Sequence, residues 1–283
     1  EASFVNKIVL DFQKGKKKTS FEKLKKFLNN NSENETARYN FALMCEQLNY
    51  IDLAKDHYNI ILKKNFKHWK SKFNLYLIYI KEKNYEKSLQ LVNDVLKIKP
   101  NYQPALRDKA VILYYLKRPD EGLPFIEKSL KQNQQDYIAL NILGLIYMEL
   151  RQLNLAIKIF IRAIEVNPKY FPTYNNLGRC YEINNDRNSA LINYKKALNL
   201  NSIFAEAINN IANCYNQSGF YKKAITYYNK ALKIEPENPK VIYNMGLAYT
   251  YLGDYKIGEK LYKKAFAIIP EDDLLKKNYS ILL

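Results

Sequence analysis

An asparagine recurs at a fixed interval along the chain, and its side-chain amide could bind another molecule. At intervals of 34 residues the chain carries Asn6, Asn40, Asn74, Asp108, Ile142, Asn176, Asn210 and Asn244. An asparagine side chain offers one acceptor and two donors, and each residue of an extended backbone offers one donor and one acceptor. A row of such amides would therefore bind peptide backbone with little demand on its sequence.

The residue types that most often catalyse reactions or hold metals are few. The chain has two histidines, His57 and His68, and three cysteines, Cys45, Cys180 and Cys214. No CxxC pair, phosphate loop, HExxH or Ser/His/Asp set is present. We expect the histidines to lie far from plausible nucleophiles, and we interpret them as exposed or part-buried. The sequence predicts no catalytic residue, no metal site and no cofactor, so we expect a protein that is not an enzyme.

Composition favours a folded protein with a basic surface. The 283 residues are 47% hydrophobic and 26% charged, and the net charge is +17. The lysines are spread along the chain, with the densest run at residues 14–26, which favours a solvated face over phosphate or membrane contact. No apolar run approaches the roughly 18 residues of a transmembrane helix, and the first residues lack the order of a signal peptide. We therefore expect a cytoplasmic protein.

The asparagines belong to a longer repeated pattern of 34 residues. Pro236 and Pro270 end the similar phrases KALKIEP and KAFAIIP, and Pro168 and Pro100 fall in the same register. With this proline as position 32, the repeats are 1–34, 35–68, 69–102, 103–136, 137–170, 171–204, 205–238 and 239–272. Positions 8 and 20 are mostly small, for example Gly178 and Ala190, whereas positions 11 and 24 are mostly bulky.

These columns have the spacing of paired helices. Positions 4, 7, 8 and 11 share one helical face, and so do positions 20, 24 and 27. Small residues let two helices approach closely, and proline at position 32 ends the second helix. Turn sequences such as LGDY at 252–255 separate the two halves. Each repeat is predicted to be a helical hairpin that buries its apolar face against its neighbours, giving an all-α protein.

The pattern resembles the tetratricopeptide repeat (TPR) family over essentially the whole chain. The match is strong in the last four repeats, whereas residues 1–34 read as a degenerate N-terminal repeat before seven repeats at 35–272. Residues 273–283 read as a capping or truncated helix. The resemblance implies an α-solenoid of about eight 34-residue units that forms a right-handed superhelix. Pro119 and Pro124 crowd the fourth repeat, where we expect an irregular hairpin.

The resemblance also implies where a partner would bind. In this family the first helices line a concave groove, and positions 2, 5, 6, 9, 12 and 13 face it. The asparagine column resembles the row that engages client chains in O-GlcNAc transferases and their bacterial relatives. We expect the amides of Asn176, Asn210 and Asn244 to be free of internal partners; the alternative is that they bridge neighbouring helices. The expected groove residues are Asn40, Asn74, Asp108, Asn176, Asn210, Asn244, Leu77, Val111, Tyr114, Tyr115, Arg179 and Asn213.

The groove residues differ between the two halves of the chain. The expected inner face of repeats two to five is apolar, through Leu43, Leu77, Ile80, Val111, Tyr114, Tyr115, Leu145 and Met148, and an exposed apolar strip marks a partner site. Repeats six and seven are polar there. Only Arg179, Asn210 and Lys240 match a carboxylate clamp of the chaperone-binding family members, which is less than the full set.

The function expected from the sequence is a scaffold that binds an extended peptide or protein segment. One alternative is the N-terminal substrate-recognition region of a larger glycosyltransferase- or sulfotransferase-type enzyme. A second alternative, supported by charge alone, is a basic binder of nucleic acid or of a membrane surface. We expect a protein or peptide partner, with no small-molecule substrate and with self-association through the terminal helix as a further possibility.

Overall fold

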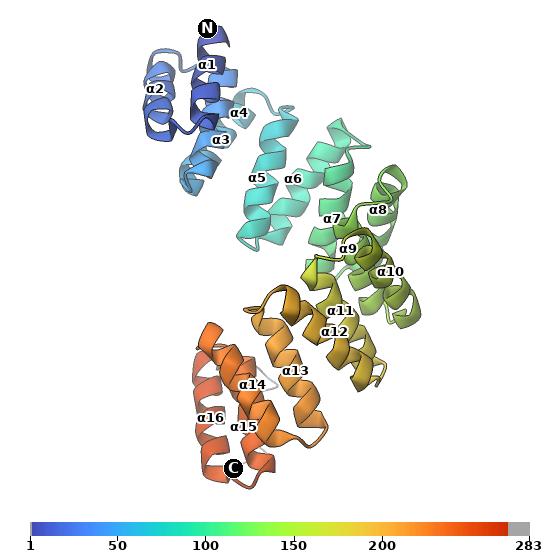
Figure 1. Cartoon of the computed structure of the whole chain (residues 1–283). Helices are drawn as coiled ribbons and strands as arrows, with labels where there is room; N and C mark the ends of the chain where they lie inside the picture. The colour runs from blue at the N-terminus through green and yellow to red at the C-terminus, as the bar shows by residue number, and fades with distance from the viewer. Residues whose placement is uncertain (1, 271–283) are drawn as a thin grey trace. The chain divides into compact units, whose positions relative to one another are not determined.

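The computed structural model describes residues 2–270, and these residues form α-helices and no β-strand (Figure 1). The helices are α1 (Ala2–Gln13), α2 (Lys17–Asn30), α3 (Glu35–Gln47), α4 (Ile51–Lys64), α5 (Trp69–Lys81), α6 (Tyr85–Ile98), α7 (Gln103–Tyr115), α8 (Pro119–Gln132), α9 (Tyr137–Glu149), α10 (Leu153–Val166), α11 (Phe171–Ile183), α12 (Arg187–Leu200), α13 (Ala205–Gln217), α14 (Tyr221–Ile234), α15 (Pro239–Tyr251) and α16 (Tyr255–Ile268). They divide between two compact units, an N-terminal unit of residues 1–134 and a C-terminal unit of residues 135–283.

The helix boundaries follow the predicted repeat. From the second repeat onward, the first helix begins at position 1 and the second at position 17, as Glu35 and Ile51 show for α3 and α4. The same holds at Ala205 and Tyr221 for α13 and α14. The all-helical class and the 34-residue hairpin repeat are thus confirmed. The predicted helix at 273–283 lies outside the described residues.

The turn inside each hairpin depends on one backbone conformation at position 15. Gly15, Gly219 and Gly253 have φ values of 96°, 78° and 88° there. The other five repeats place Asn, Lys or Arg at this position with φ between 59° and 63°. Left-handed backbone is costly for residues with a Cβ, so the packed helix pairs on either side impose it. Repeats without glycine at position 15 therefore form the same turn, although their sequences do not indicate it.

The small residues at position 8 lie beneath the bulky residue at position 24 of the same repeat. A Cβ added to Gly178 would lie 2.6 Å from Cε1 of Tyr194, and one added to Gly144 would lie 2.5 Å from Cε1 of Phe160. The rings are fully buried. Position 8 is glycine in these two repeats because the ring at position 24 occupies the space that a side chain at position 8 would need.

The third repeat reverses this arrangement. It carries Tyr76 at position 8 and Val92 at position 24, and both side chains are fully buried. Ser88 donates a hydrogen bond to the Tyr76 carbonyl at 3.2 Å, which keeps the two helices close. In this repeat the large ring comes from the first helix, through Tyr76, and the smaller side chain comes from the second helix, through Val92. The pair of one large and one smaller residue is therefore preserved, and the space between the helices is still filled.

The fourth repeat is regular, and the prediction of an irregular hairpin is wrong. Helix α8 runs from Pro119 to Gln132 with the 14 residues of the other second helices. Pro119 occupies the first helical position, where a missing N–H costs nothing, and Pro124 removes a single backbone hydrogen bond. Lys109, at a position that is otherwise apolar, is half-buried with Nζ 3.8 Å from the centroid of the Phe125 ring.

The N-terminal repeat is also a helical hairpin, despite its weak sequence match. Helix α1 buries Val5, Ile8 and Phe12 against the rest of the N-terminal unit. Among the described helices, none combines the length and apolar character needed to cross a membrane.

Candidate partner-binding surface

The candidate surface is the first-helix face, which we define as positions 5, 6, 9, 12 and 13 of the first helix in each repeat. In the N-terminal unit it contains Asn40 on α3, Asn74 and Leu77 on α5, and Asp108, Val111, Tyr114 and Tyr115 on α7. In the C-terminal unit it contains Asn176 and Arg179 on α11, Asn210 and Asn213 on α13, and Asn244 on α15. The predicted residues therefore form two surfaces, one on each unit.

The asparagine amides in the C-terminal unit bridge successive first helices. Nδ2 of Asn176 donates to Oδ1 of Asn141 at 3.0 Å, and Nδ2 of Asn210 donates to Oδ1 of Asn175 at 3.0 Å. The prediction that these amides are free is wrong, because position 6 of one helix lies beside position 5 of the preceding one. The alternative interpretation, a bridge between neighbouring helices, describes these contacts.

Asn244 makes a different bridge in the last repeat. Its Nδ2 donates to Oδ1 of Asn213 at 3.1 Å, so its partner lies 31 residues back instead of 35. As a result Oδ1 of Asn209, the acceptor at the usual position, is buried without a hydrogen-bond partner.

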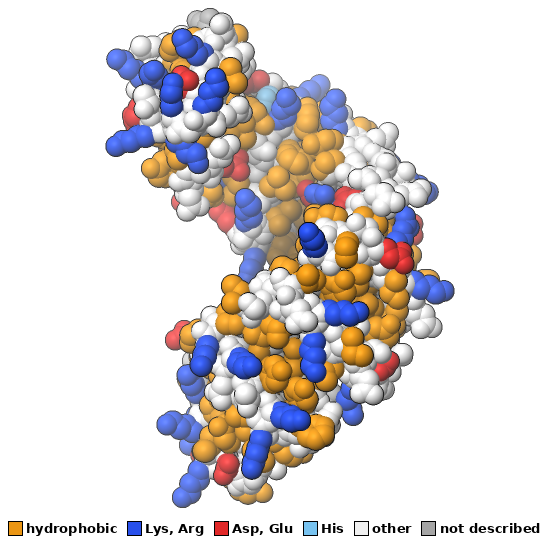
Figure 2. Space-filling view, in the orientation of Figure 1, with side chains coloured by type: hydrophobic (Ala, Val, Ile, Leu, Met, Phe, Trp, Pro, Cys, Tyr) orange, Lys and Arg blue, Asp and Glu red, His pale blue; other side chains and the backbone are white. Residues whose placement is uncertain are grey.

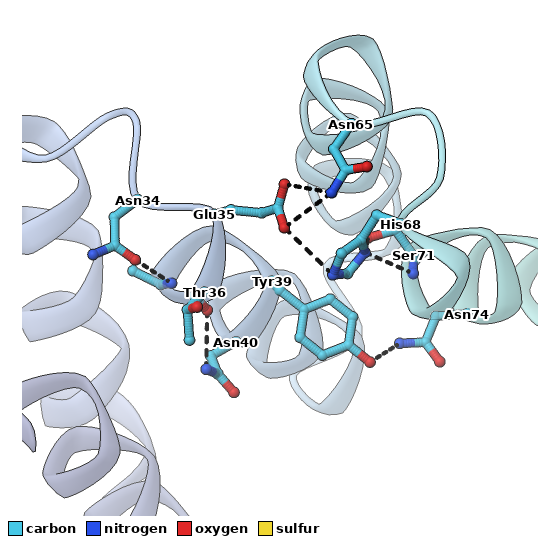
Figure 3. Close-up of polar contacts among 10 residues, drawn as sticks. Asn34, Glu35, Thr36, Tyr39, Asn40, Asn65, His68, Ser71 and Asn74 are labelled. Atoms are coloured by element: carbon cyan, nitrogen blue, oxygen red, sulfur yellow. Dashed lines mark hydrogen bonds and ion pairs between the residues drawn. The ribbon is translucent and has the colours of Figure 1, made fainter. Parts of the chain in front are cut away.

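The N-terminal unit uses its polar residues in the same structural way. Nδ2 of Asn74 donates to the hydroxyls of Tyr39 at 3.1 Å and Tyr58 at 3.0 Å, and the Tyr39 contact is drawn in Figure 3. Asn40 donates to the Thr36 carbonyl of its own helix at 2.9 Å. The NH₂ groups of Asn40 and Asn74 therefore also donate hydrogen bonds to acceptors within the protein.

Asp108, which takes the asparagine position in the fourth repeat, is buried and paired. It accepts from the Tyr76 hydroxyl at 3.1 Å and from Nε of Arg107 at 3.1 Å. The buried carboxylate therefore has both a neutral and a charged donor, as a buried charge requires. Burial, followed by the nearby Asp108 charge, raises the pKa of Tyr76.

Buried tyrosines at position 24 reach the first-helix face from beneath, which the sequence analysis missed. The Tyr194 hydroxyl donates to Oε2 of Glu182 at 2.6 Å, and the Tyr58 hydroxyl donates to Glu46 in the corresponding place. Burial is the main cause that raises the pKa of both tyrosines. The signal in the sequence was the glutamate at position 12 of the second and sixth repeats, which both have tyrosine at position 24.

A polar pocket of about 520 Å³ opens on the first-helix face of the C-terminal unit. Its lining consists of Asn213, Asn216, Gln217, Tyr221, Asn244, Leu247 and Tyr251, from α13, α14 and α15. None of these side chains carries a charge. The pocket contains Asn213 and Asn244 from the predicted groove, whereas the two tyrosines were not predicted as site residues.

The hydrogen bonds around this pocket leave one acceptor unused. Oδ1 of Asn213 accepts from the Tyr228 hydroxyl at 2.7 Å and from Asn244 at 3.1 Å. Oδ1 of Asn216 is buried and has no hydrogen-bond partner. A buried polar atom without a partner costs free energy.

The N-terminal unit presents an apolar first-helix face. Leu77, Ile80 and Val111 are half-buried there, and Tyr115 is 50% exposed. Figure 2 shows hydrophobic side chains gathered over α5, α6 and α7. The predicted apolar strip does not continue to Leu145 and Met148, which are buried inside the C-terminal unit and cannot contact a partner.

One cluster in the N-terminal unit has the composition of a catalytic triad. Nδ1 of His68 lies 2.8 Å from Oγ of Ser71. Nε2 of His68 lies 3.8 Å from Oε1 of Glu35, a contact drawn in Figure 3. The expectation that the histidines lie far from a nucleophile is therefore wrong. Ser71 is fully buried, however, and Nδ1 of His68 also accepts from the Ser71 backbone N–H at 3.2 Å. His68 thus caps the N-terminus of α5, and the serine hydroxyl is out of reach of a substrate.

Both histidines are part-buried, as expected from the sequence. His57 packs its ring against Phe41 with centroids 4.8 Å apart, and Nδ1 lies 3.2 Å from Nη1 of Arg38. Burial lowers the pKa of His57 and also that of His68, with the Arg38 charge as a further cause for His57.

The cysteines are buried thiols and not ligands or nucleophiles. Burial raises the pKa of Cys45 to about 12, that of Cys180 to about 11 and that of Cys214 to about 12. A reactive cysteine needs a lowered pKa and access to solvent. Among the described residues no group of three His, Cys, Asp or Glu side chains is placed to hold a metal ion.

The basic run at the N-terminus is exposed. The seven lysines between residues 14 and 26 are all exposed, on α2 and on the turn that precedes it, and Figure 2 shows lysine side chains around this hairpin. Lys16 makes an exposed ion pair with Asp11 at 3.3 Å. These lysines lie on a solvated surface and do not line the pocket in the C-terminal unit.

Three family models match parts of the chain. The model described as "Psidin, N-terminal TPR repeats region" matches residues 73–191, "TPR repeat" matches 212–253, and "Tetratricopeptide repeat" matches 239–272. No curated protein matched the chain in the sequence comparison.

Several solved structures share the fold. TTC0263, a thermophilic TPR protein of Thermus thermophilus, is 25% identical with a TM-score of 0.57, and the match covers 64% of this chain and 98% of that one. Pseudomonas aeruginosa pilF is 18% identical with a TM-score of 0.62, covering 75% and 96%. The APC/C hetero-tetramer Cut9-Hcn1 is 15% identical with a TM-score of 0.73, and the match covers 99% of this chain but 54% of that one.

Proposed function

Because the chain is a tetratricopeptide repeat protein, we propose that it is an interaction scaffold whose first-helix face holds an extended segment of a protein partner. In this proposal the chain binds and positions its partner and catalyses no reaction. The observation that carries the proposal is the uncharged polar pocket on the first-helix face of the C-terminal unit. The pocket lies on the same face that carries the repeated asparagines.

The hydrogen-bonding capacity that remains on the asparagines supports an extended ligand. Asn176, Asn210 and Asn244 each donate one hydrogen bond through Nδ2 to a neighbouring helix, and an NH₂ group has a second hydrogen to donate. A row that is partly used for structure can still contact a peptide backbone. The resemblance of this column to the asparagine row that engages client chains in O-GlcNAc transferases supports the same proposal.

The apolar face of the N-terminal unit supports a second region of contact. Leu77, Ile80 and Val111 are half-buried side chains on α5 and α7, so part of their apolar surface still meets water. Covering that surface with apolar side chains of a partner is favourable by roughly 25 cal/mol per Å². A partner region rich in apolar side chains fits this face.

A displayed library of random peptides, panned on the intact chain, tests the proposal. We expect enriched peptides that bind in solution and lose about tenfold or more in affinity when Ile80 is replaced by Lys, which places a charge on the apolar face. The matched control is Leu53→Lys on α4, where the side chain is already 37% exposed on a second helix. Equal losses for both variants, or no enriched peptide, would refute the proposal.

A further inference from the structure

A pocket of about 420 Å³, the α1–α2 pocket, opens on the first hairpin, where α1 and α2 lie side by side (Figure 1). Phe4 and Phe27 form its aromatic wall, with ring centroids 5.4 Å apart and an interplanar angle of 38°. Phe4 is 50% exposed and Phe27 is part-buried, so both rings keep surface that a bound molecule would cover. None of the residues that line this pocket occupies a position of the first-helix face.

Three exposed lysines share the lining with these rings. Lys7 comes from α1, and Lys23 and Lys26 come from α2. The lining has a single acid, Asp11, which makes an ion pair with Lys16 at 3.3 Å. Within the part of the chain that the structure describes, none of the three lysines forms an ion pair. With three lysines and one aspartate the lining has a net charge of +2, and its ammonium groups remain available to an anion.

This combination of charge and position belongs to the first repeat alone. Lys7 and Lys23 stand at positions 7 and 23, and every other repeat has an apolar residue at one or both of these positions. In the second repeat they are Phe41 and His57, whose ring centroids lie 4.8 Å apart, and Phe41 also stacks on Phe21 of the first repeat at 4.8 Å. The second repeat therefore packs these positions against another hairpin, whereas the first repeat places two cations there beside a pocket.

A protein segment that combines an aromatic side chain with carboxylates complements both features of the pocket. A ring inserted between the helices would cover the apolar wall and pair with its two rings, and carboxylates beside it would meet the lysines at the solvent-exposed edge, where desolvation costs little. A membrane surface is broad and does not enter a hollow between two helices. The unbroken charge of a nucleic-acid backbone would also meet Asp11, whereas a protein segment can place its acids opposite the lysines only.

We propose that the α1–α2 pocket binds an aromatic side chain of an acidic segment from a protein partner. The partner's ring lies against Phe4 and Phe27, and carboxylates on either side of it pair with Lys7, Lys23 and Lys26. An aromatic anchor in a pocket with charged residues around it is a common arrangement at protein interfaces. The inference goes beyond the scaffold proposal, because this site lies outside the first-helix face and needs no ligand there.

Four blocked peptides of equal length, DEDFDED, DEDADED, NSNFNSN and KSKFKSK, test the pocket on the intact chain. Isothermal titration calorimetry measures their affinities, and the backbone amide resonances of Lys7 and Phe27 in the ¹⁵N-labelled chain report where they bind. We expect DEDFDED to shift both resonances in a saturable way. It should bind at least about tenfold more tightly than the alanine peptide or the neutral peptide, and its affinity should fall as salt is added. The basic peptide should not bind.

Two variants and one matched control sharpen the test. Lys23→Glu reverses a charge at the pocket and Phe4→Ala removes an exposed ring, and each should weaken binding of DEDFDED about tenfold. Lys25→Glu makes the same change of charge on the same helix, at an exposed residue that does not line the pocket. At about 0.15 M salt this control should change the affinity by about twofold or less. All three side chains are exposed, so the variants should fold, and circular dichroism checks this.

Several results would overturn the inference. Equal affinity of the alanine peptide would reduce the site to charge alone, equal affinity of the neutral peptide would reduce it to apolar contact, and equal losses for Lys23→Glu and Lys25→Glu would indicate diffuse attraction to a basic hairpin. Tighter binding of a single-stranded oligonucleotide, or of vesicles that contain phosphatidylserine, at the same resonances would assign the pocket to those partners, and no shift with any probe would leave it without this role. Library peptides that depend on Ile80 would still leave the scaffold proposal standing.

Discussion

The hydrogen bond between Asn176 and Asn141 is expected to stabilise the C-terminal unit, and replacing Asn176 by Ala should measure it. The two side chains are 8% and 5% exposed, and the bond length is 3.0 Å. Losing the bond and leaving Oδ1 of Asn141 buried without a partner costs about 1–3 kcal/mol. Alanine is the better helix former by up to about 0.7 kcal/mol. The free energy of unfolding should therefore fall by about 1–2 kcal/mol.

A double-mutant cycle isolates the contribution of the bond itself. Asn141→Ala alone removes the acceptor, and in the double variant with Asn176→Ala no partner is left unpaired. The double variant should lose about 1 kcal/mol less than the sum of the two single variants, because the residues are in contact. Asn199→Ala is the control, since Asn199 is exposed on α12 of the same unit, and this variant should be as stable as the parent or slightly more stable.

Equilibrium unfolding in urea, followed by two signals, provides the assay. Far-UV circular dichroism reports all helices, whereas the single tryptophan, Trp69, begins α5 and reports the N-terminal unit by fluorescence. Asn176→Ala should lower the stability in the circular dichroism transition and leave the Trp69 transition less affected. A variant as stable as the parent, or a cycle without coupling, would show that the bridge contributes nothing and that the amide is available to a ligand.

Three further predictions concern packing, pH and charge. Gly178→Leu should lower the free energy of unfolding in urea by at least about 1–3 kcal/mol, since the leucine Cβ alone would lie 2.6 Å from the Tyr194 ring. The control, Lys195→Leu on the exposed surface of α12, should change it by less than about 0.5 kcal/mol. Equal effects of the two variants would contradict the assigned helix faces. Burial lowers the pKa of His57 and His68, so the unfolded chain binds protons more tightly, and the free energy of unfolding should decline as the pH falls through about 6.5, the pKa of an unfolded histidine. His68→Asn keeps a side chain that can cap α5, and it should remove part of this decline in unfolding curves measured between about pH 5 and 7. An unchanged dependence of stability on pH would argue against the assigned cap. Binding to duplex or single-stranded nucleic acid should be weak at physiological salt in a fluorescence anisotropy titration, whereas tight binding that falls by orders of magnitude between low and physiological salt would favour the nucleic-acid alternative.

Local sequence signals were enough to predict the helices and their period. Proline at position 32, small residues at positions 8 and 20 and bulky residues at position 24 act within one hairpin or between neighbours, so a single repeat contains the information. This is why α3 and α13 begin at Glu35 and Ala205, the first residues of their repeats. The prolines of the fourth repeat were misjudged because Pro119 stands at the first position of α8, where it favours the helix.

The asparagine column shows where the sequence was insufficient. The 34-residue spacing correctly indicated one side of the first helices, but it did not indicate the partner of each amide. Asn176 bonds 35 residues back and Asn244 bonds 31 residues back, a difference that depends on how two neighbouring helices are offset. Hydrogen bonds form over a narrow range of distances, so small shifts in packing decide whether an amide is bridged or open.

The sequence by itself determined the helical repeat, the register of the helix pairs and the side on which polar and apolar positions gather, because these follow from residue size and spacing along a single hairpin. The tertiary structure alone decided that the asparagines bridge helices, that tyrosine hydroxyls from the second helices reach Glu46 and Glu182, and that one polar pocket forms between α13, α14 and α15. The reason is that these contacts join residues of different helices, and only the packed geometry fixes which atoms come within hydrogen-bonding distance.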